Sequence, residues 1–199
     1  MLLKCVCASS LMVLVAAGAH AQEHRQLGAH EHGHGTLNIA IEGTAVTMDL
    51  EAPGDDIVGF EHEAVTPNDK AAVEAASVTL AKALEIFKMP SGAGCKVKDA
   101  KVSLQAEKHD EEETYVNNSK AGSATQQHDH EEEHEGHKEF HVTYELECAA
   151  PANLTTIDFD YFKNFSRSQK LTVNLIASKG QSSFEVTPER PRLDLTGLI

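Results

Sequence analysis

The chain has 199 residues, the size of one ordinary domain, and 41% of them are hydrophobic, which allows a buried core and excludes a wholly disordered protein. Lys and Arg number 17 against 31 Asp and Glu, so the formal charge is -14 at pH 7, which excludes nucleic-acid binding because phosphate backbones are repelled. The chain also has 12 histidines, and imidazole is the commonest metal ligand in proteins. The composition therefore indicates metal-dependent or pH-dependent chemistry.

Residues 1–21 are typical of a secretory signal peptide. Lys4 precedes an apolar run over residues 11–17, and Ala19-His20-Ala21 is a small-x-small cleavage site. The apolar run is too short for a permanent membrane anchor, and no second long apolar run follows. We therefore expect cleavage after Ala21 and an exported protein without membrane insertion.

Removal of the signal peptide leaves two cysteines, Cys95 and Cys148. Two thiols in an exported chain most often form one disulfide bond, and we expect this pairing here. A metal site with two cysteine ligands is the alternative, but each cysteine stands alone without a CxxC neighbour.

The mature chain is predicted to begin with a flexible His-rich arm over residues 22–35, because this segment is polar, contains glycine and shows no periodicity. A single domain follows over residues 36–199. Apolar residues alternate with polar ones over residues 37–41 and again over 46–50, with Gly43 and Thr44 between them. This pattern predicts a β-hairpin, followed by a connection.

One long helix is predicted over residues 67–89. Thr66 and Pro67 are typical of a helix N-terminus, and Pro90 ends the pattern. Four apolar side chains share one face of this range: Val73, Leu80, Leu84 and Phe87. At 1.5 Å per residue such a helix would span roughly 34 Å, enough to cover a sheet.

The second half of the chain is predicted to consist mainly of strands. Alternation favours strands over residues 95–108 and 138–148, which the Cys95–Cys148 bond would make antiparallel neighbours. The alternation slips by one around Asp99-Ala100, which predicts a β-bulge. Three further strands and a short helical piece are expected at residues 154–160, 170–178, 182–188 and 161–167, respectively. The expected fold class is α+β, a mainly antiparallel sheet with one long helix packed on it.

Residues 109–137 form a His/Asp/Glu-rich insertion between the two strands that the Cys95–Cys148 bond would join. The insertion holds nine acidic residues, and its only sizeable apolar side chains are Tyr115 and Val116. Such a segment cannot bury enough apolar surface to offset the entropy lost on ordering. We therefore expect a disordered loop inserted into the domain.

The histidines cluster. His20 leaves with the signal peptide, and nine of the remaining 11 fall in two short windows. The windows contain His24, His30, His32 and His34, and then His128, His130, His134, His137 and His141. Solvated histidine is the plain alternative, but Lys, Glu or Ser would serve a solvated segment equally well. Imidazoles interspersed with carboxylates suit Zn²⁺, and also other divalent transition metals such as copper or nickel.

Both windows also match HExxH, the metalloprotease pattern, as HEHGH at residues 30–34 and HEEEH at residues 130–134. Protease chemistry needs both histidines on a helix with an apolar back packed in a core. The first match contains Gly33, and the second lies in an acidic tract. We therefore expect a protein that is not an enzyme.

Several segments occur in a characteristic order. The mature chain contains AHEHGHGTLNIAIEG, then EAPGDDIVGFEHEA before a helix, then Gly94-Cys95, then the His/Asp/Glu-rich insertion and a strand that ends in Cys148. This ordered set resembles the ZrgA-like zinc-uptake family of Gram-negative periplasms over nearly all of residues 29–199.

The resemblance implies a periplasmic zinc-binding protein that assists high-affinity zinc import when zinc is scarce, with the substrate-binding component of a zinc ABC importer as its partner. The family pattern maps onto Cys95 and Cys148 and onto a set of metal ligands: His30, His32, His34, Glu61, His62, His128, His130, His134, His137 and His141. We expect a tighter site where the arm or the loop meets the folded domain. A copper, nickel or general divalent-metal buffer or chaperone without an importer partner is the alternative.

Overall fold

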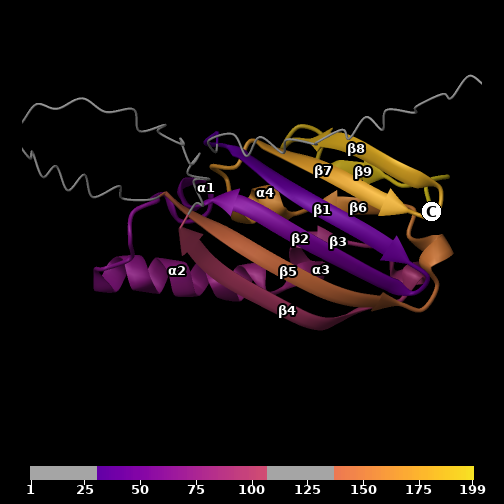
Figure 1. The fold of residues 1–199 in the computed structure, drawn as a ribbon, viewed down its shortest axis with the longest axis horizontal. Coiled ribbons are helices and arrows are strands. Elements are labelled where there is room, and N and C mark those ends of the chain that lie inside the picture. Colours follow the sequence, from indigo (N-terminus) through magenta and orange to yellow (C-terminus); the bar gives the residue numbers. More distant parts are fainter. Residues whose placement is uncertain (1–30, 107–136) are drawn as a thin grey trace, which may run out of the picture.

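The computed structural model describes residues 31–106 and 137–199 (Figure 1). Six strands form the main sheet in the order β4-β5-β2-β1-β7-β8. Their bounds are β1 (His34–Glu42), β2 (Ala45–Pro53), β4 (Cys95–Ala106), β5 (Lys138–Cys148), β7 (Lys170–Ala177) and β8 (Gly180–Val186). Neighbouring strands are antiparallel except β1 and β7, which run parallel.

The predicted hairpin is confirmed. β1 pairs antiparallel with β2 from Thr36↔Glu51 to Glu42↔Ala45, and Gly43 and Thr44 form the turn. Along both strands, buried side chains alternate with side chains that are partly or fully exposed. The period of two therefore places every second residue in the core on one face of the sheet.

A second layer covers that face. It contains a three-stranded sheet in the order β3-β6-β9, formed by β3 (Phe87–Lys88), β6 (Thr156–Phe159) and β9 (Arg192–Asp194). Phe87 makes edge-on contacts with Tyr144 of the main sheet, at 6.0 Å between ring centroids, and with Phe159, at 5.5 Å. Short helices complete the structure: α1 (Gly54–Val58), α3 (Ala83–Ile86), α4 (Tyr161–Asn164) and the 3₁₀ turns η1 (Ser91–Ala93) and η2 (Pro151–Asn153).

The expected α+β class, with one long helix packed on the sheet, is wrong. Strands make up 48% of the described residues and helices 24%, and α2 (Pro67–Leu80) is the only helix of seven or more residues among them. Thr66 caps α2 as predicted, but the helix ends at Leu80, with Ala81 as its C-cap, and the chain continues into α3 and β3. Phe87, which the helical pattern included, is instead a strand residue paired with Phe159.

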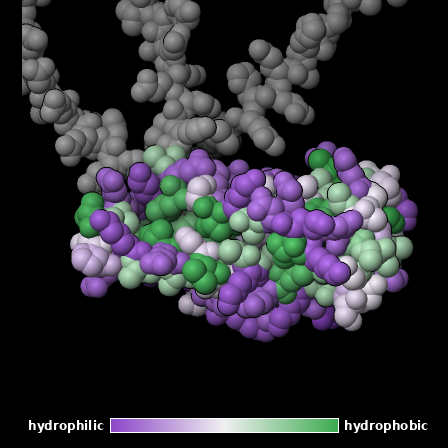
Figure 2. Space-filling view, turned by 90° about the horizontal axis from the view of Figure 1, so that it is seen from below, coloured by the Kyte–Doolittle hydropathy of each residue, from purple (hydrophilic) through white to green (hydrophobic). Residues whose placement is uncertain are grey.

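The predicted helix was too long because only some of the apolar residues on its predicted face belong to α2. Leu84 lies in α3 and Phe87 in β3. Within α2, only Ala76 and Leu80 are buried, whereas Val78 is 57% exposed. A helix needs a continuous apolar stripe to cover a sheet, and α2 lacks one. In Figure 1, α2 extends beyond the end of the sheet. Seen from the side on which α2 and β4 lie, hydrophobic patches are separated by hydrophilic side chains (Figure 2).

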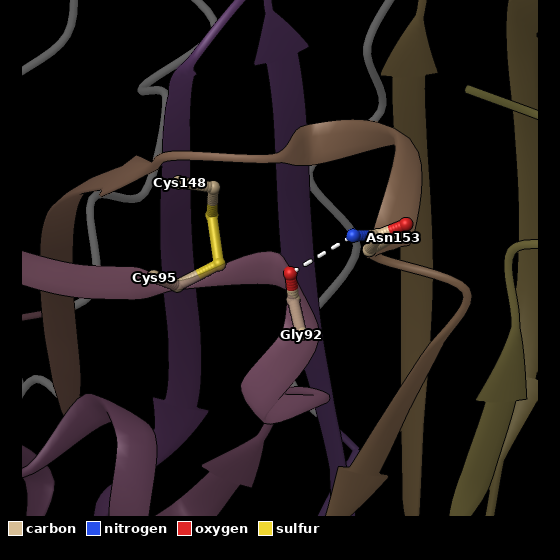
Figure 3. Close-up of a disulfide and its surroundings, with 4 residues drawn as sticks. All are labelled: Gly92, Cys95, Cys148 and Asn153. Atoms are coloured by element: carbon tan, nitrogen blue, oxygen red, sulfur yellow. Dashed lines mark hydrogen bonds between the residues drawn. A yellow bond between two sulfur atoms is a disulfide. The ribbon is translucent and has the colours of Figure 1, made fainter.

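The two strands that contain Cys95 and Cys148 lie as predicted. β4 and β5 are antiparallel neighbours from Cys95↔Cys148 to Ala106↔Lys138, with a register shift between Val97 and Asp99 that confirms the expected bulge. Cys95 and Cys148 are joined by a disulfide bond (Figure 3). Beside it, Asn153 Nδ2 donates a hydrogen bond to the Gly92 carbonyl at 3.0 Å, which ties η2 to η1.

The strands predicted over residues 154–160, 170–178 and 182–188 correspond to β6, β7 and β8, and the helical piece between the first two is α4. The predicted signal peptide, most of the arm, the last two residues of the strand predicted over 95–108, and residues 109–136 of the insertion lie outside the described residues. Within the two described ranges, no helix has the length and apolar character needed to cross a bilayer.

Candidate metal centre

Three of the predicted metal ligands lie together at one end of the main sheet. His32 precedes β1 by two residues, His137 directly precedes β5, and Glu61 lies in the loop between α1 and α2. The sheet topology explains this meeting. The end of β2 pairs with the beginning of β5 at Pro53↔Glu139, and the beginning of β1 lies on the other side of β2. The sheet thus brings three segments that are distant in sequence together at one end of its strands.

Glu61 joins the two histidines. Its Oε1 lies 3.1 Å from His32 Nε2, and its Oε2 contacts His137 Nδ1. One ligand atom from each of the three residues lies within 4.8 Å of the others. In a tetrahedral zinc site with bonds of 2.0–2.2 Å, ligand atoms are about 3.4 Å apart, so small side-chain movements suffice to enclose an ion.

The burial of the three side chains differs. The Glu61 side chain is 11% exposed, whereas those of His32 and His137 are 61% and 60% exposed. The carboxylate therefore forms the floor of the site, and both imidazoles remain open to solvent. The hydrogen bond to Glu61, followed by the charge of Glu61, raises the pKa of His32. A metal ion must compete with this proton for the imidazole.

Gly54, the first residue of α1, allows the site to assemble. A Cβ atom at this position would lie 2.6 Å from the Phe60 carbonyl oxygen and 2.7 Å from the Lys138 carbonyl oxygen. The neighbouring strand end is held by a hydrogen bond of 2.9 Å, which the Lys138 N–H donates to the Glu61 carbonyl. The absence of a side chain at Gly54 therefore lets the backbones that carry Glu61 and His137 approach closely.

The ligand set is two imidazoles and one carboxylate. Zinc accepts this combination, which leaves the fourth position of a tetrahedral ion available to a water or an exchanging ligand. No thiolate or thioether is part of the group, so the site favours a divalent ion of borderline character over Cu(I). Ligand type alone does not select zinc over copper or nickel, because affinity follows the Irving–Williams order.

The remaining described residues of the predicted set lie apart from this group. His34 Nε2 is 2.8 Å from Thr172 Oγ1 and so faces β7. The His62 ring stacks on Phe60 with 4.6 Å between ring centroids, and its Nδ1 lies 2.9 Å from the Glu63 carbonyl oxygen. His141 contacts Glu139 through Nε2. The other predicted ligands, His30, His128, His130 and His134, lie outside the described residues.

Sequence reasoning did not identify Asp56, a buried carboxylate in α1. Asp56 Oδ1 accepts a hydrogen bond of 2.6 Å from the N–H of Gly33, the residue after His32. Burial raises the pKa of Asp56, although the Gly33 N–H acts in the opposite direction. A pair of adjacent aspartates in a polar connection resembles an exposed turn, and only the fold shows that the second is enclosed.

The comparisons with known proteins agree with this chemistry. A search of curated proteins gave no match. A family profile described as ZrgA family zinc uptake protein matches residues 29–195, a range that includes all three residues of the metal centre and both cysteines. The chain therefore belongs to the ZrgA family of zinc uptake proteins.

Proposed function

We propose that this protein captures Zn²⁺ in the periplasm and assists its high-affinity import under zinc limitation. The observation that carries the proposal is the His32–Glu61–His137 group, which lies at one end of the main sheet in a chain of a zinc uptake family. In this proposal, export by the predicted signal peptide delivers the protein to the periplasm, and the partner is the substrate-binding component of a zinc ABC importer.

The geometry supports capture followed by release. Both imidazoles are exposed, so an ion can reach them from solvent without opening the core. The formal charge of -14 raises the local concentration of divalent cations, most strongly at low ionic strength. Three protein ligands leave one position at which a ligand of the acceptor can enter before the protein's own ligands depart. A carrier needs such an exchange, and we propose a carrier rather than an enzyme.

Growth and metal accumulation test this function. A strain that lacks the protein should grow poorly in zinc-depleted medium and accumulate less zinc, and the wild-type chain should restore both. Chains carrying His32→Ala, Glu61→Gln or His137→Ala should restore them less well. His62→Ala is the matched control, because His62 is an exposed histidine next to Glu61 that lies outside the group.

The alternative function gives a different pattern. A copper or nickel buffer without an importer partner would leave zinc-limited growth unchanged and would protect cells against excess copper or nickel. That result, or full restoration of zinc uptake by all three site variants, would contradict the proposal.

A further inference from the structure

Asp56 is a buried carboxylate that is not one of the three candidate metal ligands. It is 1% exposed, and Oδ2 has no protein hydrogen-bond partner among the described residues. Burying a carboxylate costs several kcal/mol unless its hydrogen bonds compensate. Within residues 31–106 and 137–199, Asp56 is bonded to the backbone through Oδ1, which accepts from the Gly33 N–H at 2.6 Å, and this is the contact through which it acts.

Hydrogen bonds fix both the N–H and the carbonyl group of Gly33. Its N–H is bound by Asp56, and its carbonyl oxygen accepts hydrogen bonds of 2.8 Å from the N–H groups of Gln169 and Lys170. Its φ of +85° is a conformation that residues with a side chain rarely adopt. These contacts fix the backbone conformation directly after His32. In this conformation the imidazole lies beside Glu61.

The helix that carries Asp56 is also fixed. Asp55 forms an ion pair with Arg167, with 2.7 Å between Arg167 Nη2 and Asp55 Oδ2, and Arg167 Nε donates to the Asp55 carbonyl at 2.8 Å. Gly54 packs against the backbone carbonyls of Phe60 and Lys138. One short helix therefore contacts all three segments that supply the ligands.

We infer that Asp56 is a positioning residue of the metal centre: its carboxylate fixes the Gly33 N–H and thereby holds His32 in line with Glu61 and His137. The inference rests on the proposed metal-binding function of this site. Partners that orient a metal ligand are worth about ten- to a hundredfold in metal affinity. Asp56 differs from the usual case because it orients the ligand through the backbone rather than through the imidazole ring.

Two substitutions distinguish the effect of the hydrogen bond that Asp56 accepts from the effect of its charge. Asp56→Asn removes the charge but keeps an oxygen that can accept the Gly33 hydrogen bond, whereas Asp56→Ala removes both. Asp49→Asn is the matched control, since it removes a charge at an exposed position of β2 and leaves both α1 and the contact with Gly33 intact. Asp56→Glu keeps the charge but displaces the carboxylate, and it replaces Asp56→Ala in the comparison should the alanine variant not fold.

The readout is the protection of individual histidines by zinc. The full chain, freed of metal and with its disulfide intact, is titrated with buffered zinc and treated with diethyl pyrocarbonate, and modification of His32 and His137 is measured by mass spectrometry. Residue-resolved detection separates this site from the other histidines. Unfolding of each metal-free variant is followed in parallel.

We expect Asp56→Ala, or Asp56→Glu in its place, to raise the half-protecting zinc concentration at His32 and His137 about ten- to a hundredfold. Asp56→Asn should stay within about threefold of the wild type, because the acceptor oxygen remains. Asp49→Asn should do the same, because it changes no residue of the metal centre and leaves the Gly33 contact intact. In a His32→Ala background, Asp56→Ala should cause no further loss of protection at His137. A purely structural role would reduce protection equally in both backgrounds.

The inference is overturned if Asp56→Ala leaves protection unchanged, if Asp56→Asn weakens binding as much as Asp56→Ala, or if the loss persists in the His32→Ala background. Failure of the underlying function gives a separate signature. In that case, His32→Ala itself would leave zinc protection of His137 unchanged, whatever the residue at position 56.

Discussion

Gly54→Ala should destabilise the fold and weaken the metal centre together. The added Cβ would lie 2.6 Å and 2.7 Å from two backbone oxygens, those of Phe60 and Lys138, and neither can rotate away as a flexible side chain could. Overpacking of this kind costs about 1–3 kcal/mol, and two backbone contacts place the cost near the upper end. Alanine returns about 0.4–1 kcal/mol by restricting the unfolded chain.

The net loss is therefore about 2 kcal/mol, which corresponds to a fall of about 4–8 °C in Tm for a protein of this length. Thermal and denaturant unfolding of the metal-free, oxidised protein, followed by circular dichroism, measures it. Gly92→Ala is the matched control, because a Cβ there meets only Asn153 atoms at 3.9 Å. We expect its stability to change by less than about 0.5 kcal/mol.

Since Gly54 lies between the segments that carry Glu61 and His137, its substitution should also raise the zinc concentration that half-protects His137 by about tenfold or more. A Gly54→Ala protein as stable as the Gly92→Ala control would refute the close approach of these backbones. A destabilised protein with unchanged protection of His137 would refute the link between this approach and the metal centre.

Denatured, unreduced protein should contain no thiol that can be labelled at Cys95 or Cys148, and replacing both with serine should cost up to about 4 kcal/mol in unfolding experiments, because the bond closes a separation of 53 residues. Replacing residues 107–136 with a short turn should lower zinc stoichiometry in calorimetry and leave the Tm of the metal-free protein nearly unchanged, since Ala106 and Lys138 are cross-strand neighbours; a collapse in Tm would contradict this. Because Glu61 raises the pKa of His32, the pair should stabilise the metal-free fold below about pH 6.5 and lose this contribution as pH rises through the raised pKa. Glu61→Gln should abolish that dependence of Tm on pH, and zinc binding near neutral pH should release protons.

The strands were predictable because alternation is a local signal. A period of two and its interruption predict the hairpin around Gly43, the disulfide-linked strands β4 and β5, and the bulge near Asp99. The helix over residues 67–89 was overextended because apolar residues of α3 and β3 happened to continue the helical spacing of α2. Nothing local distinguishes a helix residue from Phe87, whose place is decided by pairing with Phe159.

The sequence predicted which kinds of side chain would form the candidate site, but not which individual residues would come together. His32, Glu61 and His137 were each expected to bind metal, as were His34, His62 and His141, which the structure places elsewhere. Which residues meet depends on strand register, since the pairing Pro53↔Glu139 brings the beginning of β5 to the end of β2. Asp56 could not be found from the sequence because its burial is a property of the tertiary structure.

One titration tests the metal centre most directly. The metal-free full chain, labelled with ¹⁵N-histidine, receives up to one equivalent of Zn²⁺ while the ring signals are followed by long-range ¹H–¹⁵N NMR. The account predicts that the His32 and His137 signals change first and together, and that Glu61→Gln abolishes this early change. If the histidines of residues 128–134 bound the first equivalent while His32 and His137 kept their metal-free signals, the His32–Glu61–His137 group would not be the primary zinc site.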